Sequence, residues 1–186
     1  MVDTHMSGNN PDLREKVDQS RGFFKKLQLV IPALREYRKL EDIRAADELL
    51  RKQVFDKLDE SKNKLETLRK AMSDKGDFTS LVSIGTIISQ IQQIAGEVLH
   101  SQQGSAGISP NIVIDENTLN KLYEYDYNFV NSAEQISSTV AESLTEYTSG
   151  TSTAQAIAAK ISPMLEDFKH VWKQRLESVE NILVTK

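Results

Sequence analysis

The sequence predicts an all-α protein: an up-and-down antiparallel bundle of about four long helices, with a shorter N-terminal helix and a long loop near residues 103–114. Three observations lead to this fold class. Apolar residues recur every three or four positions along most of the chain. Only 8 of the 186 residues are Gly and only 4 are Pro, which leaves long stretches without helix breakers. The apolar fraction of 39% is large enough for a core, which excludes disorder of the whole chain.

The first ten residues are set apart from the predicted domain. Met1–His5 is followed directly by a second Met, which is typical of a leader left by a cloning vector, and residues 6–10 are expected to be a disordered terminus. Residues 11–186 are then predicted to form a single helical-bundle domain. Its first helix is expected over residues 11–34, with a break at Pro32 because proline cannot donate the helical hydrogen bond.

Residues 35–74 carry the clearest helical pattern of the chain. Their apolar stripe advances in steps of three or four residues through Leu40, Ile43, Ala46, Leu50, Val54, Leu58, Ser61, Leu65, Leu68 and Met72. Charged residues of both signs fill most other positions, which is typical of a solvated amphipathic helix or of a coiled-coil strand. Gly76 is expected to end this helix in a left-handed cap.

Residues 77–102 differ from the preceding helix because no charged residue occurs between Asp77 and Glu97. Apolar residues are spread around much of the predicted helix, and the other positions are Ser, Thr, Gln, Gly and Ala. A helix that is apolar most of the way round is usually buried, so this one is expected to lie most centrally. Asp77 is its expected N-cap.

Two further helices are predicted, over residues 115–148 and 151–185. The first is expected to end at Ser149-Gly150, and Pro163 is expected to mark an internal break or a fresh start in the second. The connections at Gly76 and Gly150 are short, which favours antiparallel neighbours on either side of each.

Two carboxylate-x-x-His pairs raise the possibility of a di-metal carboxylate bundle enzyme. They are Glu97 with His100 and Asp167 with His170, and bundle di-iron sites use two such pairs together with single carboxylates. The single carboxylates could come from Glu60 or Glu66 and from Glu134 or Glu142. Helical geometry opposes this interpretation, because each histidine projects about 160–180° away from the apolar stripe of its own helix. We therefore predict no metal site and keep this enzyme class as a remote alternative.

No other pattern of residues predicts catalysis or a cofactor. The chain has no Cys, which excludes thiolate chemistry, and it contains no Gly-x-Ser-x-Gly turn and no glycine-rich phosphate loop. The net charge of −4 argues against nucleic acid as a partner. The lack of Cys and of a secretory signal in this sequence predicts a cytoplasmic location.

The best positive signal concerns interaction with another protein. Tyr123, Tyr127 and Val130 form a second face on the helix over residues 115–148, about 110° from its apolar stripe. Tyrosine suits interfaces because it joins a large apolar body to a polar tip. Two interpretations stay open: another helix of the same chain covers this face, or a different molecule does. Tyr123, Tyr127 and Val130 are the predicted interface residues.

The predicted function is that of a non-catalytic interaction or scaffold protein that binds a protein partner or a second copy of itself. The alternative is a peripheral or inserting membrane-active protein that uses residues 78–99. That stretch approaches the roughly 20 residues of a membrane span, but it contains several glutamines and hydroxyl groups, which disfavour membrane contact.

Overall fold

The computed structural model describes residues 22, 25–30, 43–101 and 116–184, and the expected break at Pro32 and the loop near 103–114 lie outside these ranges. Four long helices make up most of the described chain: α2 (Ile43–Asp74), α3 (Leu81–His100), α4 (Glu116–Thr148) and α5 (Ala154–Val184). Residues 25–30 form a short helical segment at the N-terminal side. No strand occurs among the described residues, which confirms the predicted all-α fold.

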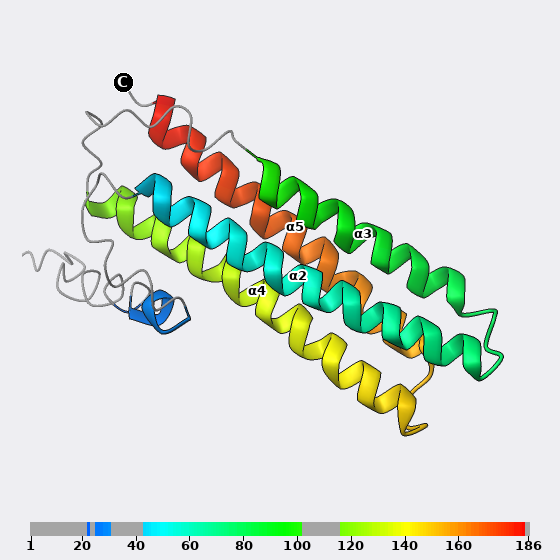
Figure 1. Cartoon of the computed structure of the whole chain (residues 1–186). Helices are drawn as coiled ribbons and strands as arrows, with labels where there is room; N and C mark the ends of the chain where they lie inside the picture. Colours follow the sequence, from blue (N-terminus) through cyan, green and yellow to red (C-terminus); the bar gives the residue numbers. More distant parts are fainter. Residues whose placement is uncertain (1–21, 23–24, 31–42, 102–115, 185–186) are drawn as a thin grey trace, which may run out of the picture.

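The four helices form a bundle in which the chain reverses direction from each helix to the next (Figure 1). Helix α2 packs against α3 and α4, and α5 packs against the same two helices. The connection over residues 102–115 therefore joins helices at opposite corners of the bundle. As a result α2 and α4 lie side by side and run parallel, and so do α3 and α5 (Figure 1).

Both short turns have the same helix-ending geometry, as their glycines predict. After α2, the backbone N–H of Asp77 donates to the carbonyl of Met72 at 2.9 Å and that of Gly76 donates to Ser73 at 3.0 Å. After α4, Thr151 donates to Glu146 at 2.9 Å and Gly150 to Tyr147 at 3.2 Å. This pair of bonds is a Schellman motif. It requires a left-handed residue, and Gly76 and Gly150 have φ angles of 74° and 78°.

The expected N-cap at Asp77 is wrong. Helix α3 begins at Leu81, four residues later, after Ser80, whose side chain makes no capping hydrogen bond. The reason lies in the preceding turn, because the backbone of Asp77 completes the Schellman motif that ends α2. Burial and the nearby Asp77 carboxylate raise the pKa of the Tyr147 phenol.

The expected interruption at Pro163 is also wrong, because α5 runs from Ala154 to Val184 with Pro163 inside it. The proline lies on the exposed side of the helix, and so does Ala159, whose carbonyl would have accepted the missing hydrogen bond. A carbonyl on the solvent side can be hydrated, so the helix continues without a break.

One hydrophobic core runs along the bundle, and all four helices contribute to it. The largest fully buried side chains include Phe129, Phe168, Leu58, Leu65 and Ile91. Helix α3 is not more central than the others: it packs against α2 and α5, and its remaining side faces outward. Its apolar residues alone suggested burial all round, but its Ser, Thr and Gln residues form a neutral outer face. None of the described helices has a stretch both long and apolar enough to cross a membrane.

Candidate functional site

The face predicted from Tyr123, Tyr127 and Val130 lies on α4 and is largely occupied by the same chain. Val130 is buried, and both tyrosines are half-buried against the core. The ammonium of Lys26, in the helical segment 25–30, lies 5.7 Å from the centre of the Tyr127 ring. These contacts fit the interpretation in which the chain covers its own second face. A contact between another molecule and the exposed parts of Tyr123 and Tyr127 stays a prediction.

The segment over residues 25–30 is fixed to the bundle by both apolar and polar contacts. Leu27 is 1% exposed and belongs to the hydrophobic core. The side-chain amide of Gln53 on α2 donates to the backbone carbonyl of Val30 at 3.0 Å. This short segment, blue in Figure 1, is therefore part of the folded domain.

The two described histidines, His100 and His170, are exposed, as their positions on the helices predict. The carboxylates that could have joined them are engaged elsewhere: Glu134 pairs with Lys57 at 3.0 Å and Glu60 with Lys64 at 2.8 Å. Within the described part of the chain, no group of three or more His, Asp or Glu side chains could hold a metal ion.

A buried layer of charged residues connects all four helices, and the sequence analysis missed it. Arg175 on α5 donates from Nε to Asp126 on α4 at 2.8 Å and from a terminal nitrogen to Asp47 on α2 at 2.6 Å. Arg51 on α2 donates to Asp47 at 2.8 Å and to the backbone carbonyl of Leu99 on α3 at 3.0 Å. Two carboxylates thus face two guanidinium groups, so the layer has no net formal charge. We call these four charged residues the buried ion layer.

The apolar stripes contained a signal for this layer. Along α4 the stripe jumps from Leu122 to Phe129, and Asp126 occupies the skipped inward position. On α2, Asp47 precedes the buried Leu50 by three residues, which gives it a place in the same inward register. A charged residue at an inward position where the apolar stripe has a gap therefore indicates a buried ion, provided that a neighbouring helix carries the opposite charge at the same height in the bundle.

Burial and the facing charges act in opposite directions on the pKa values of the layer. Burial raises the pKa of the Asp126 carboxyl above its ordinary value, with a further rise from Asp47, although the Arg175 guanidinium acts in the opposite direction. For Arg175, burial acts to lower the pKa, but the two carboxylates outweigh it and raise the pKa. Burial and the nearby Asp126 together raise the pKa of the Tyr123 phenol.

Two aromatic rings, Phe129 and Trp172, lie next to the Arg175 guanidinium, and a third, Phe168, packs against Phe129. Phe129 stacks on Trp172 with ring centres 4.8 Å apart, and its centre is 5.4 Å from that of Phe168. The guanidinium carbon of Arg175 lies 5.3 Å from the Phe129 ring centre, within the range of a cation–π contact. Because Arg175 is 2% exposed, the layer and these rings act on the packing of the bundle and offer no accessible ligand site.

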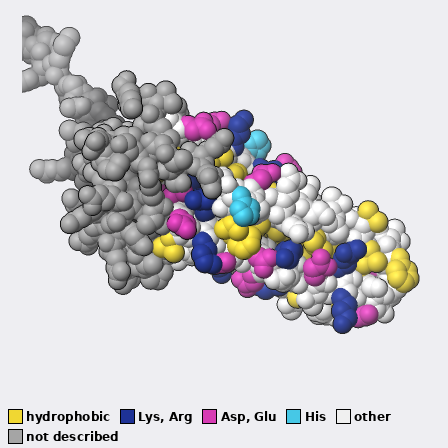
Figure 2. Space-filling view, turned by 45° about the horizontal axis from the view of Figure 1, so that its top comes forward, with side chains coloured by type: hydrophobic (Ala, Val, Ile, Leu, Met, Phe, Trp, Pro, Cys, Tyr) yellow, Lys and Arg dark blue, Asp and Glu magenta, His cyan; other side chains and the backbone are white. Residues whose placement is uncertain are grey.

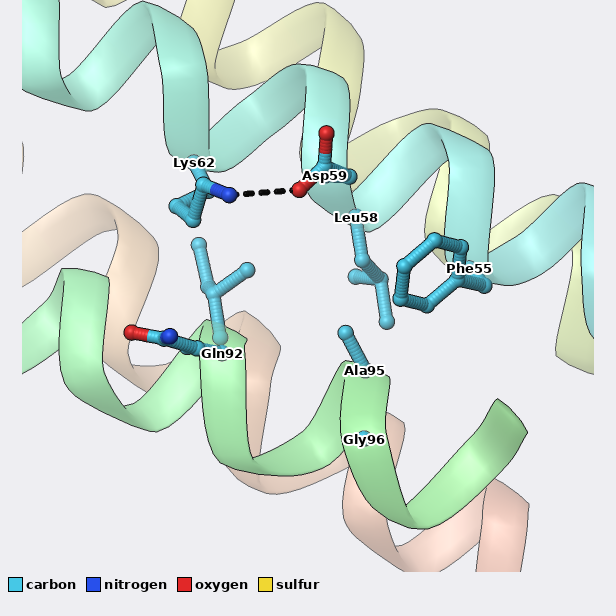
Figure 3. Close-up of a pocket in the computed structure, with 8 residues that line it drawn as sticks. Phe55, Leu58, Asp59, Lys62, Gln92, Ala95 and Gly96 are labelled. Carbon is cyan, nitrogen blue, oxygen red and sulfur yellow. Dashed lines mark hydrogen bonds and ion pairs between the residues drawn. The ribbon is translucent and has the colours of Figure 1, made fainter. Parts of the chain in front are cut away.

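A groove opens on the surface between α2 and α3 (Figure 3). Its cavity volume is about 300 Å³, and Phe55, Leu58, Ile91 and Ala95 give it an apolar lining. Asp59 and Lys62 form an ion pair of 2.5 Å at the rim, and the Lys62 ammonium lowers the pKa of Asp59. The small residues Ala95 and Gly96 leave the space open. We call this hollow the α2/α3 groove.

A second hollow of about 400 Å³ lies at the opposite end of the bundle from the buried ion layer, between the two short turns. Its polar groups include Lys75, Ser152 and Thr153. The Lys75 ammonium donates to the carbonyl of Tyr147 at 3.1 Å and lies 4.6 Å from the centre of its ring. The cation is therefore used to join the two turns.

The outward side of α3 carries no charged residue between Asp77 and Glu97. Phe78, in the turn before the helix, is 66% exposed and Val82 is 75% exposed. Figure 2 shows mostly uncharged surface on this part of the molecule, with apolar side chains at its tip. Exposed large apolar groups on a neutral helix are typical of a contact surface.

Comparisons with protein-family models, with curated proteins and with solved structures found no match.

Proposed function

We propose that this protein is a non-catalytic interaction or scaffold protein that binds a protein partner, and that one such partner is a second copy of itself. The observation that carries the proposal is the neutral outer side of α3, where Phe78 and Val82 are exposed although both are large apolar side chains. Burial of such groups against another molecule is favourable, and no charge has to be desolvated between Asp77 and Glu97.

The rest of the described surface supports this choice of α3. Exposed positions of α2 carry many ion pairs, such as Lys52 with Asp56 and Lys64 with Glu60. The second face of α4 is already contacted by the segment over residues 25–30. The absence of Cys in the sequence is the reason for proposing the cytoplasm as the place of action.

Sedimentation velocity and light scattering across a wide range of protein concentrations test the self-association. We expect the weight-average mass to rise with protein concentration. Salt should change this rise little, because the contact surface is uncharged. A strict monomer at the highest concentration contradicts it.

The same exposed side chains favour a second candidate, a peripheral membrane protein that uses residues 78–99. Phe78 and Val82 could enter the headgroup region of a bilayer, although the surrounding Ser, Thr and Gln residues lack the basic groups that strengthen binding to anionic lipids. Co-sedimentation with neutral and with anionic vesicles separates the two candidates, because only the membrane protein would pellet with lipid.

A further inference from the structure

Five residues on the outward side of α3, together with Phe78 in the turn before the helix, form a line that the described part of the chain leaves uncovered. They follow one another in steps of four and three residues: Phe78, Val82, Gly85, Ser89, Gln92 and Gly96. At 100° per residue the five that belong to α3 lie within an arc of about 80°, and Phe78 precedes the helix by three residues. Every one of them is exposed or half-buried in the structure. We call this line the α3 seam; steps of four and three residues are the spacing with which one helix packs against another in a coiled coil.

The two glycines of the α3 seam have no evident role within the monomer. A Cβ atom built on Gly85 or Gly96 meets nothing within 4 Å, so no neighbouring atom requires the absence of a side chain. Neither glycine has a positive φ angle, in contrast to Gly76 and Gly150. Glycine in the interior of a helix destabilises it relative to alanine. Small residues here are explained if another backbone or a large side chain approaches this side of α3.

We propose that the α3 seam binds the same seam of a second copy in antiparallel orientation about a two-fold axis. This inference rests on the proposed function and names the partner and the orientation. In an antiparallel pair centred on residue 87, Phe78 of one copy lies opposite Gly96 of the other, Val82 opposite Gln92, and Gly85 opposite Ser89. The largest side chain of one copy, Phe78, thus meets the smallest residue of the other, Gly96.

A parallel pair would lack this complementarity. It would place Phe78 against Phe78 and Gly96 against Gly96, with crowding at one end and a void at the other. In the antiparallel pair, each Phe78 enters the α2/α3 groove of the partner next to Gly96, on the lining of Phe55 and Ala95 (Figure 3). The groove volume of about 300 Å³ is sufficient for one ring, since a dry cavity of about 150 Å³ already accepts benzene.

The hydroxyl groups in and beside the seam are suited to burial against an identical surface. The Ser89 hydroxyl donates to the carbonyl of Gly85 at 3.0 Å, so it loses no partner when water is excluded. Beside the seam, the Thr86 hydroxyl donates to the carbonyl of Val82 at 3.0 Å in the same way. A two-fold axis through a charged seam would bring like charges together, and here no residue between Asp77 and Glu97 is charged.

The orientation can be tested with single cysteines, because the chain has no Cys of its own. We expect a mixture of Val82→Cys and Gln92→Cys to form a disulfide-linked heterodimer under mild oxidation. Each variant alone is expected to cross-link poorly, because residue 82 and its own copy are offset by about 15 Å along the axes, beyond disulfide reach of about 7 Å between Cα atoms. The control is Gln135→Cys, an exposed position on α4, mixed with Val82→Cys.

The contribution of the aromatic side chain is tested by Phe78→Ser, with Leu29→Ser as the matched control. Both residues are exposed apolar side chains, at 66% and 73%, but only Phe78 belongs to the seam. In sedimentation experiments up to about 1 mM protein, Phe78→Ser is expected to raise the dimer dissociation constant about tenfold or more, and Leu29→Ser to leave it unchanged. High concentrations are needed because the helical part of the seam, from Val82 to Gly96, is only about 21 Å long, which is short for a standard interface of about 800 Å² per partner.

The possible outcomes separate this inference from the proposed function. Heterodimer cross-links together with the loss of association in Phe78→Ser support the antiparallel seam. Dimers in which Val82→Cys cross-links to itself, or in which neither cysteine reacts, overturn the seam but leave self-association standing. A wild-type chain that stays monomeric throughout overturns both. Lipid pelleting that is lost in Phe78→Ser, without any dimer, assigns the surface to a membrane and also overturns the inference.

Discussion

Arg175 is the residue whose removal tests the buried ion layer most directly. Its side chain is 3% exposed and bridges two carboxylates, at 2.6 Å to Asp47 and at 2.8 Å to Asp126. In Arg175→Met, Asp47 keeps its bond from Arg51, whereas Asp126 loses the cation that pairs with it. Breaking a buried ion pair by removing one partner costs about 3–5 kcal/mol, so we expect the free energy of unfolding to fall by about that amount.

A double substitution distinguishes an unpaired charge from a simple loss of packing. In Arg175→Met with Asp126→Leu, no orphaned carboxylate is left, and we expect at least about half of the lost stability to return. Urea unfolding followed by circular dichroism gives all four free energies of the cycle, with the slope against urea as a check that unfolding stays two-state. A loss below about 1 kcal/mol in Arg175→Met, or additive effects in the cycle, would refute the reasoning.

Three other predictions concern pH, glycine and the N-terminal segment. The pKa of Asp126 is raised in the folded chain, so the stability that its carboxyl contributes is complete below the ordinary carboxyl pKa and is lost as pH rises through the folded value. The unfolding free energy of Asp126→Asn should therefore fall less between about pH 4 and pH 7 than that of the wild type. Urea titrations at each pH measure the difference. Gly85→Ala should raise the unfolding free energy of the dilute protein by about 0.5–1 kcal/mol, whereas Gly150→Ala should lower it by about 1–2 kcal/mol because φ is positive at Gly150. A lower unfolding free energy in Gly85→Ala would mean that another atom lies close to residue 85, which the structure does not show. Leu27→Ala should cost about 2–5 kcal/mol in thermal or urea unfolding and Leu29→Ala less than about 0.5 kcal/mol, and equal effects would mean that residues 25–30 do not belong to the core.

Much of the fold could be predicted from the spacing of apolar residues. The inward positions Leu50, Val54, Leu58 and Leu65 are all buried, and the glycines at 76 and 150 end their helices as expected. These features depend on local geometry, namely the helical repeat and the left-handed cap, and local geometry is encoded in neighbouring residues.

The errors and omissions arise where tertiary contacts decide. Asp77 is a favourable N-cap residue, but its backbone is already used to end the preceding helix. Asp126 and Arg175 are charged, so the spacing of apolar residues does not reveal them. Only the structure shows that they pair, with 2.8 Å between Arg175 Nε on α5 and Asp126 Oδ1 on α4. The exposed side of α3 was missed for a similar reason, because the sequence alone does not show which neighbours surround a helix.

The order of the helices around the bundle has a consequence for the way in which the chain folds. The pairs α2–α3 and α4–α5 are joined by tight turns, so each can assemble from contacts close in sequence. The contacts of α2 with α4 bring together residues such as Lys57 and Glu134, far apart along the chain. Closing such a long loop carries an entropic cost before its contacts form. Two helical hairpins that arise quickly and then dock in a slower step would follow from this connectivity.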